Sequence, residues 1–193
     1  MNNLFTVKWS VWAIVAAAIL PPVNASSFDN ATLYSPNNSV PISPTRSTLP
    51  WQRWPVVGDA TLRWGPWVIY DSELRTPNGR YHHQDSQLAL VIKYQRNIEN
   101  EDLLTATDEQ WQHLGIQAGK RAKWLRMLAQ IWPDVKQGDR LIFVLQDRQG
   151  VFYQDNRQIG IISDPEMARS FINIWLSPQT AYPDIRRQLI GQS

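Results

Sequence analysis

Residues Gly150 to Thr180 read GVFYQDNRQIGIISDPEMARSFINIWLSPQT, and they combine the signals of a hairpin with those of a helix. Its first part is rich in strand-forming residues and is interrupted by Asp155-Asn156, which predicts two strands joined by a tight turn. Ser163 or Asp164 then predicts the N-cap of a helix, with proline in its first turn. The helix carries an apolar stripe of Met167, Phe171, Ile174 and Trp175. A hairpin that leads into an amphipathic helix is scaffold rather than chemistry, and the stretch holds no Cys, no His and no G-x-S-x-G serine.

The residues upstream extend this pattern. Arg140 to Gln146 predicts a strand that turns back into the hairpin, so three strands form a meander. Thr61 to Tyr70 and Gln87 to Tyr94 have the β-branched and aromatic content of two further strands, and TPNGR at Thr76 to Arg80 supplies the turn between them. These strands are expected to be antiparallel.

Two helices are predicted between these two groups of strands. In the first, Asn100 is the predicted N-cap and Glu101 and Asp102 lie in the first turn. This helix is expected to bury one face and to stop at Gly115; the face consists of Leu103, Thr107, Trp111 and Leu114. The second ends at Pro133, and its predicted inner face consists of Ala118, Ala122, Leu125, Leu128 and Trp132. A short helix from Pro183 to Leu189 follows the amphipathic one. This order of elements predicts an α+β fold with one antiparallel sheet covered by helices on one face.

The N-terminal residues have the composition of an export signal. Residues 1–25 combine Lys8, a short apolar run and the small residues Val23-Asn24-Ala25, which predicts a signal peptide cleaved after Ala25. Residues 26–50 are crowded with Ser, Asn, Thr and Pro and predict a disordered polar leader. The expected domain then covers residues 51–193 of a periplasmic bacterial protein. Retention of the first segment as a membrane anchor is the alternative.

Charge and cysteine content narrow the function classes. Without Lys8, the chain has 18 basic and 17 acidic residues, and a formal charge of +1 argues against nucleic acid as a partner. The sequence contains no cysteine, so disulfides and thiol catalysis are excluded. At 193 residues with 43% hydrophobic content, the chain is long enough to bury a sizeable core.

Five sequence blocks occur in a fixed order between Gly58 and Gly191. They are L-R-x-x-x-x-x-x-Y-D at Leu62 to Asp71, K-Y-x-R-x-I at Lys93 to Ile98, W-P-D-V-K-x-G-D-R-L at Trp132 to Leu141, F-Y-x-D-N-R-x-I-G at Phe152 to Gly160, and D-P-E-x-A-R-x-F-x-x-I-W-L-S-P-x-T at Asp164 to Thr180. Together they resemble the bacterial exported chalcone-isomerase-like proteins. That resemblance implies the chalcone isomerase fold, an open-faced β-sandwich with a cleft between sheet and helices.

The resemblance also implies candidate site residues. In that superfamily, plant enzymes cyclise chalcones with an arginine that stabilises a phenolate, and non-catalytic relatives bind fatty acids through an arginine and a tyrosine. Arg63 is the best match for the arginine, and Tyr70 falls near a threonine of the plant enzymes. Arg96, in the second block, is a further candidate. The other polar site residues have no match, so the prediction is non-catalytic binding of a small amphiphilic acid, such as a fatty acid, without a cofactor.

Two other functions stay open. An isomerase or lyase would use Arg63 to stabilise an oxyanion and Tyr70 to orient the substrate or relay a proton. An envelope accessory protein would instead bind a protein partner through a basic helix face or a tryptophan-rich edge. The basic face comprises Lys120, Arg121, Lys123 and Arg126, and the edge comprises Trp51, Trp54, Trp64 and Trp67. The preferred interpretation of these tryptophans is packing at the rim of the sheet.

The sequence predicts no metal site. His82, His83 and Asp85 have suitable ligand chemistry, but they fall in an exposed loop, and adjacent side chains on a strand point to opposite faces. Asp71 and Glu73 lie two apart on a predicted strand, so they are expected on one face.

Overall fold

The computed structural model describes residues 49–83 and 85–192. The predicted signal peptide, its cleavage site and all of the predicted leader except Leu49 and Pro50 lie outside the described residues. Within the described part, a short 3-10 helix η1 (Pro50–Arg53) precedes the first strand.

Six strands form one antiparallel sheet in which each strand pairs with its neighbours in sequence. They are β1 (Val56–Trp64), β2 (Trp67–Arg75), β3 (Leu88–Tyr94), β4 (Arg140–Gln146), β5 (Gln149–Gln154) and β6 (Arg157–Ile162). The predicted strand from Thr61 to Tyr70 is wrong, because it is a hairpin of β1 and β2. The chain reverses at Gly65, whose φ of +56° favours glycine. Strand-forming residues lie on both sides of this short turn, so the sequence pattern resembles one continuous strand.

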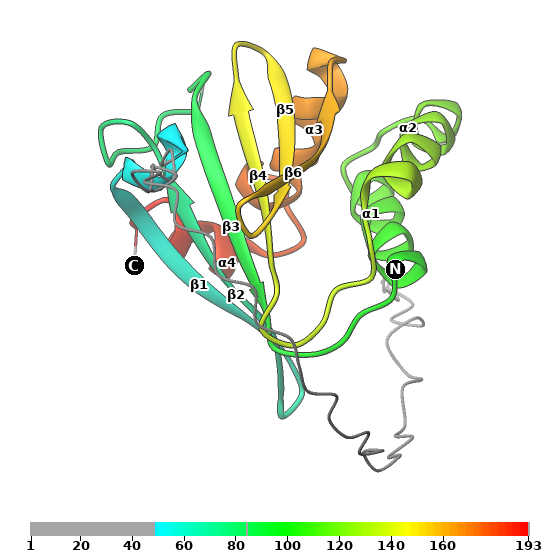
Figure 1. Cartoon of the computed structure of the whole chain (residues 1–193), viewed down its shortest axis with the longest axis horizontal. Coiled ribbons are helices and arrows are strands. Elements are labelled where there is room, and N and C mark those ends of the chain that lie inside the picture. The colour runs from blue at the N-terminus through cyan, green and yellow to red at the C-terminus, as the bar shows by residue number, and fades with distance from the viewer. Residues whose placement is uncertain (1–48, 84, 193) are drawn as a thin grey trace, which may run out of the picture. The chain divides into compact units, whose positions relative to one another are not determined.

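In the described residues, four α-helices complete the fold (Figure 1). They are α1 (Asn100–His113), α2 (Ala118–Ile131), α3 (Pro165–Leu176) and α4 (Pro183–Leu189). α1 and α2 pair between β3 and β4 in sequence, α3 packs against β4, β5 and β6, and α4 packs against β1 and β2. The α+β fold with an antiparallel sheet covered by helices is confirmed.

The core lies between the sheet and the helices. Aromatic rings from both layers meet there, with centroids 4.8 Å apart for Phe143 and Phe171 and 5.4 Å apart for Phe171 and Trp175. Phe152 and Trp132 extend the same cluster. Met167, Phe171 and Trp175 are all buried in this core, so the predicted stripe of α3 is confirmed as a packing surface.

Local signals set some limits of the helices, but the predicted N-cap of α1 is wrong: Asn100 is its first helical residue, the N-cap is Glu99, and the Glu99 side chain makes no capping hydrogen bond. The Asn100 side chain instead donates to the Trp132 carbonyl. Asp164 is the N-cap of α3, and its Oδ1 accepts hydrogen bonds from the backbone N–H groups of Glu166 and Met167. Gly115 follows α1 with a φ of +76°, which confirms the predicted stop.

The predicted inner face of α2 needs a correction. Ala118 and Ala122 are exposed, whereas Trp124 and Leu128 are buried. The indole of Trp124 decides the orientation of the helix, because its Nε1 donates to Asp164 Oδ2 at 3.2 Å and its ring packs on Trp111. Burial of a large aromatic surface stabilises the fold more than burial of two alanine methyl groups.

The opposite face of the sheet, which we call the open face, has a small apolar cluster covered by η1. This cluster consists of Trp51 from η1 and four buried strand residues, Ala89, Val91, Ile142 and Val144. Trp51 therefore packs on the sheet as expected. Trp64 and Trp67 do not, since their side chains stack on each other at 5.5 Å and are 36% and 48% exposed.

Candidate functional site

Tyr70 lies inside the layer between sheet and helices. It is on β2, opposite Leu62 of β1 and Tyr94 of β3, and it faces the helices. The Trp175 Nε1 on α3 donates a hydrogen bond to the Tyr70 hydroxyl at 2.9 Å. The ring of Tyr94 stands edge-on to that of Tyr70, with centroids 6.1 Å apart. Strand pairing and helix packing thus fix the position of the phenol.

The phenols in this region are held in their neutral form. Burial raises the pKa of Tyr70 far above its usual value of 10, and the nearby phenols of Tyr182 and Tyr94 raise it further, against a lowering by the Trp175 hydrogen bond. Burial likewise raises the pKa of Tyr94. The pKa of Tyr182 is also raised, by burial and then by Glu109. We call Tyr70, Tyr94 and Tyr182 the tyrosine cluster.

The tyrosine cluster can donate hydrogen bonds to a bound acceptor. Tyr70 receives a hydrogen bond from Trp175, and Tyr182 receives one from Gln110 Nε2 at 3.2 Å. A hydroxyl that accepts from an N–H keeps its own proton for another acceptor. A carboxylate or carbonyl oxygen is therefore a suitable ligand group for these phenols, and the surrounding layer is apolar.

The two predicted arginines lie at the same end of the sheet as Tyr70 but not against it. Arg63 follows Leu62, which pairs with Tyr70, and the side chain of Arg63 is exposed. Arg96 is half-buried, and its Cζ lies 5.6 Å from the centroid of the Trp67 ring. Neither arginine is among the side chains that shift the Tyr70 pKa. Their role in binding stays a prediction.

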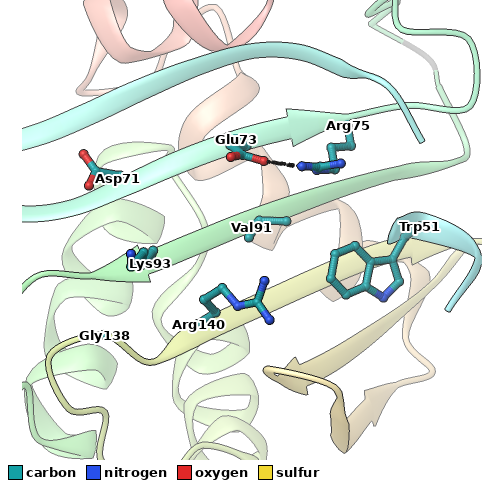
Figure 2. Close-up of a pocket in the computed structure, with 8 residues that line it drawn as sticks. All are labelled: Trp51, Asp71, Glu73, Arg75, Val91, Lys93, Gly138 and Arg140. Carbon is teal, nitrogen blue, oxygen red and sulfur yellow. Dashed lines mark hydrogen bonds and ion pairs between the residues drawn. The ribbon is translucent and has the colours of Figure 1, made fainter. Parts of the chain in front are cut away.

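A groove with a volume of about 480 Å³ opens on the other face of the sheet (Figure 2). We call it the open-face groove; its lining residues are Trp51, Asp71, Glu73, Arg75, Val91, Lys93, Gly138 and Arg140. Asp71 and Glu73 both line it, so their predicted common face is confirmed. Figure 2 shows Trp51 at one end and Asp71, Lys93 and Gly138 at the other.

The two carboxylates of the open-face groove are already engaged. Glu73 Oε2 forms an ion pair with Arg75 Nη2 at 2.6 Å, and Arg75 Nη1 also donates to the Trp54 carbonyl. Asp71 accepts hydrogen bonds from Thr61 Oγ1 and Gln95 Nε2, both at 2.6 Å. These contacts hold the two carboxylates in place within the fold.

Of the remaining polar candidates from the sequence, His82 and Asp85 contact each other and His83 is exposed. His82 is exposed, and its Nδ1 lies 3.5 Å from Asp85 Oδ1. In residues 49–83 and 85–192, no group of three or more His, Cys, Asp and Glu side chains has an arrangement suited to a metal ion.

The predicted basic face of α2 needs a correction. Arg121 Nε pairs with Asp108 at 2.7 Å, so this side chain turns toward α1 and does not belong to an outer surface. Lys120 is exposed but pairs with Glu166 at 2.6 Å. Lys123 and Arg126 are exposed. A face read from α-helical spacing alone thus overstates the free positive charge.

Sequence reasoning missed four of the side chains that matter here. Tyr94 stands in the same block as Arg96, and its apolar strand context gave no sign of a second buried phenol. Trp175 was assigned to the core without its hydrogen bond to Tyr70. Lys93 and Arg140 become neighbours only through the pairing of β3 with β4.

In the described part of the chain, no helix is long and apolar enough to cross a membrane.

Comparisons with known proteins agree with this architecture. The family model described as "chalcone isomerase-like" matches residues 70–191. An uncharacterized protein of Haemophilus influenzae is 26% identical over 147 residues, which cover 76% of this chain and 73% of that protein. The crystal structure of an Arabidopsis thaliana fatty-acid binding protein superposes with a TM-score of 0.55 at 7% identity, covering 70% of this chain and 86% of that one. The structural match shows the fold. Because the family model covers more than half of the chain, the protein belongs to the chalcone isomerase-like family.

Proposed function

We propose that this protein binds a small amphiphilic acid, such as a fatty acid, without catalysing a reaction on it. The observation that carries the proposal is the tyrosine cluster, which presents neutral phenol donors within an apolar layer. The acid group meets the Tyr70 hydroxyl, and the tail lies among apolar side chains between sheet and helices. Arg63 and Arg96 lie at the same end of the sheet but not against Tyr70, and we expect them to attract the acid group at longer range.

The structural neighbour supports the ligand class. Its name describes fatty-acid binding, and it shares the fold with this chain. Fold alone does not transfer function, so the argument rests on the phenols. An acid bound there gains hydrogen bonds at one end and loses apolar surface from water at the other.

Binding is better supported than catalysis by the same residues. A proton relay works best when its pKa lies near the operating pH, and burial moves the pKa of Tyr70 away from neutrality. The nearest carboxylates in sequence, Asp71 and Glu73, lie on the opposite face of the sheet and are engaged. Turnover of an enone-type phenolic substrate that is lost in Arg63→Ala with unchanged folding would contradict the non-catalytic proposal.

The proposal is tested by isolating the full-length gene product under native conditions and identifying bound lipids by mass spectrometry. We expect co-purifying fatty acids, and after their removal a re-added fatty acid at 100 times its Kd should stabilise the protein by about 2.7 kcal/mol. Tyr70→Phe should weaken binding roughly tenfold, since it removes the hydroxyl donor. Tyr153→Phe, on the open face, is the matched control and should bind normally. A protein that is purified empty and is not stabilised by fatty acids would refute the proposal.

The site of action in the cell is a separate proposal. The segment ending Val23-Asn24-Ala25 supports export with cleavage after Ala25, which makes the protein periplasmic. Amino-terminal sequencing of protein released by osmotic shock should then begin SSFDNATLYS. An intact Met1 on protein found only in the membrane fraction would favour a tethered form.

A further inference from the structure

The open-face groove is separate from the tyrosine cluster. Along β2, Tyr70 points to the helices, while Asp71, Glu73 and Arg75 point to the groove. The sheet itself therefore lies between the two regions. A volume of about 480 Å³ is within the range of small-molecule sites. A ligand in this groove would be a different molecule from the amphiphilic acid proposed above.

Two positive charges lie directly opposite each other in the groove. Lys93 on β3 is the register partner of Arg140 on β4. Like charges at opposed positions of an antiparallel pair destabilise the sheet, because their side chains are only a few ångströms apart. Asp155 pairs with Arg140, and Asp71 lies opposite Lys93 on β2, so part of this repulsion is already offset, and an anion that bridges the two side chains would offset it further.

The groove leaves positive donors available. Among the described residues, Lys93 has no ion pair, and Asp71, its register partner on β2, is occupied by Thr61 and Gln95. Arg140 uses only its Nε, which pairs with Asp155 Oδ1 at 3.1 Å, so its two terminal nitrogens can bind another acceptor. The groove therefore offers hydrogen-bond donors with positive charge, while its carboxylates are satisfied within the fold.

The rest of the lining selects an organic anion. Figure 2 shows Val91 between Lys93 and Trp51, and the six-membered ring of Trp51 on the side that faces Arg140. Trp51 is 4% exposed and Val91 is 7% exposed, so an apolar group meets only a small area at the edge of this indole. We propose that the open-face groove binds a small organic anion, whose carboxylate or phosphate oxygens are held by Lys93 and Arg140 and whose apolar part packs on Trp51 and Val91.

Calorimetric titration of the full chain with benzoate, phenyl phosphate and inorganic phosphate tests this proposal. The two aromatic anions should bind, and the stronger of them identifies the acid group that the site prefers. Inorganic phosphate should bind more weakly, because it lacks the apolar part. Lys93→Gln and Arg140→Gln should each weaken binding about tenfold or more, since each removes a charge-assisted hydrogen bond. Lys93→Arg should retain most of the affinity.

Two controls separate this site from other positive charge and from the proposed function. Lys123→Gln removes one exposed charge from α2 and should leave binding unchanged. Tyr70→Phe should also leave it unchanged. If binding is insensitive to Lys93→Gln and Arg140→Gln, the groove is not the site, and if Tyr70→Phe alone weakens it, the anion occupies the tyrosine cluster instead. Circular dichroism of each variant verifies folding, and failure of all three probes to bind the wild type overturns the proposal.

Discussion

The two faces of one sheet are built from alternate residues of the same strands, yet they differ in how much of each is covered and in how many charged residues each carries. On β4, Leu141, Phe143 and Leu145 enter an aromatic core, whereas Arg140 faces the open-face groove. Four helices cover the first face, and the second is covered in part by η1. Most of the buried apolar surface and most of the charged side chains are therefore on opposite faces of the sheet. Packing on the helix side contributes most of the stability, and the open side has two positive charges, Lys93 and Arg140, at opposed positions of neighbouring strands.

Removing an aromatic ring from the helix side should have the largest effect. Phe143 is buried against Phe152 and Phe171, with centroids 5.0 and 4.8 Å away. Phe143→Ala should lower the free energy of unfolding by about 3–5 kcal/mol, because it removes apolar burial and leaves a cavity. Denaturant unfolding measures this loss. Val144→Ala, the next residue and on the open face, should cost less, and equal losses would contradict the division between the faces.

Removing the buried phenol should have an intermediate effect that depends on pH. Tyr70→Phe should cost about 1 kcal/mol at neutral pH, because the Trp175 N–H loses its acceptor. Since the pKa of Tyr70 is raised in the folded state, its protonated form contributes stability that is complete below pH 10. That contribution falls as pH rises above 10, because the Tyr70 phenol of the unfolded chain then loses its proton while the buried phenol of the folded protein keeps it.

The cost of Tyr70→Phe should therefore shrink between neutral pH and pH 11. Urea unfolding of wild type and variant at several pH values measures it. Tyr153→Phe, on the open face and less buried, provides the matched comparison and should show a weaker pH dependence. A cost that grows with pH would mean that Tyr70 is not stabilised in its neutral form.

Breaking an ion pair on the open face should have the smallest effect. Glu73 and Arg75 are 2.6 Å apart, but their side chains are 43% and 25% exposed, so water and salt screen the pair. Glu73→Gln should lower stability by less than about 1 kcal/mol, and 0.5 M salt should reduce the difference further. Thermal unfolding at two salt concentrations measures it. A loss as large as that of Phe143→Ala would show that the open face carries core-like stability.

Much of the fold could be predicted because the signals are local. The meander of β4, β5 and β6 follows from strand-forming runs and turn residues, and Asp164 marks the start of α3. The hairpin of β1 and β2 was missed because Gly65-Pro66 is short and flanked by tryptophans that suit a strand. The inner face of α2 was misassigned because small apolar residues were weighed equally with Trp124.

The sites were less predictable, since their members come from distant elements. Tyr70 was found through the family resemblance, but its contacts with Tyr94 and Trp175 depend on the register of β2 with β3 and on the packing of α3. The opposition of Lys93 and Arg140 depends on the register of β3 with β4. A shift of one residue in either register would send these side chains to the other face.

By itself, the sequence determined the elements that short-range physics controls, and five blocks in order identified the family that the comparison confirms. Turn residues, helix caps and alternating apolar residues act over a few positions, so they can be read without coordinates. The tertiary structure alone decided that Arg63 is exposed, that Tyr70 is buried beside Tyr94, and that Lys93 faces Arg140. The physical reason is that strand register and helix packing minimise the free energy of the whole core, which no single segment specifies.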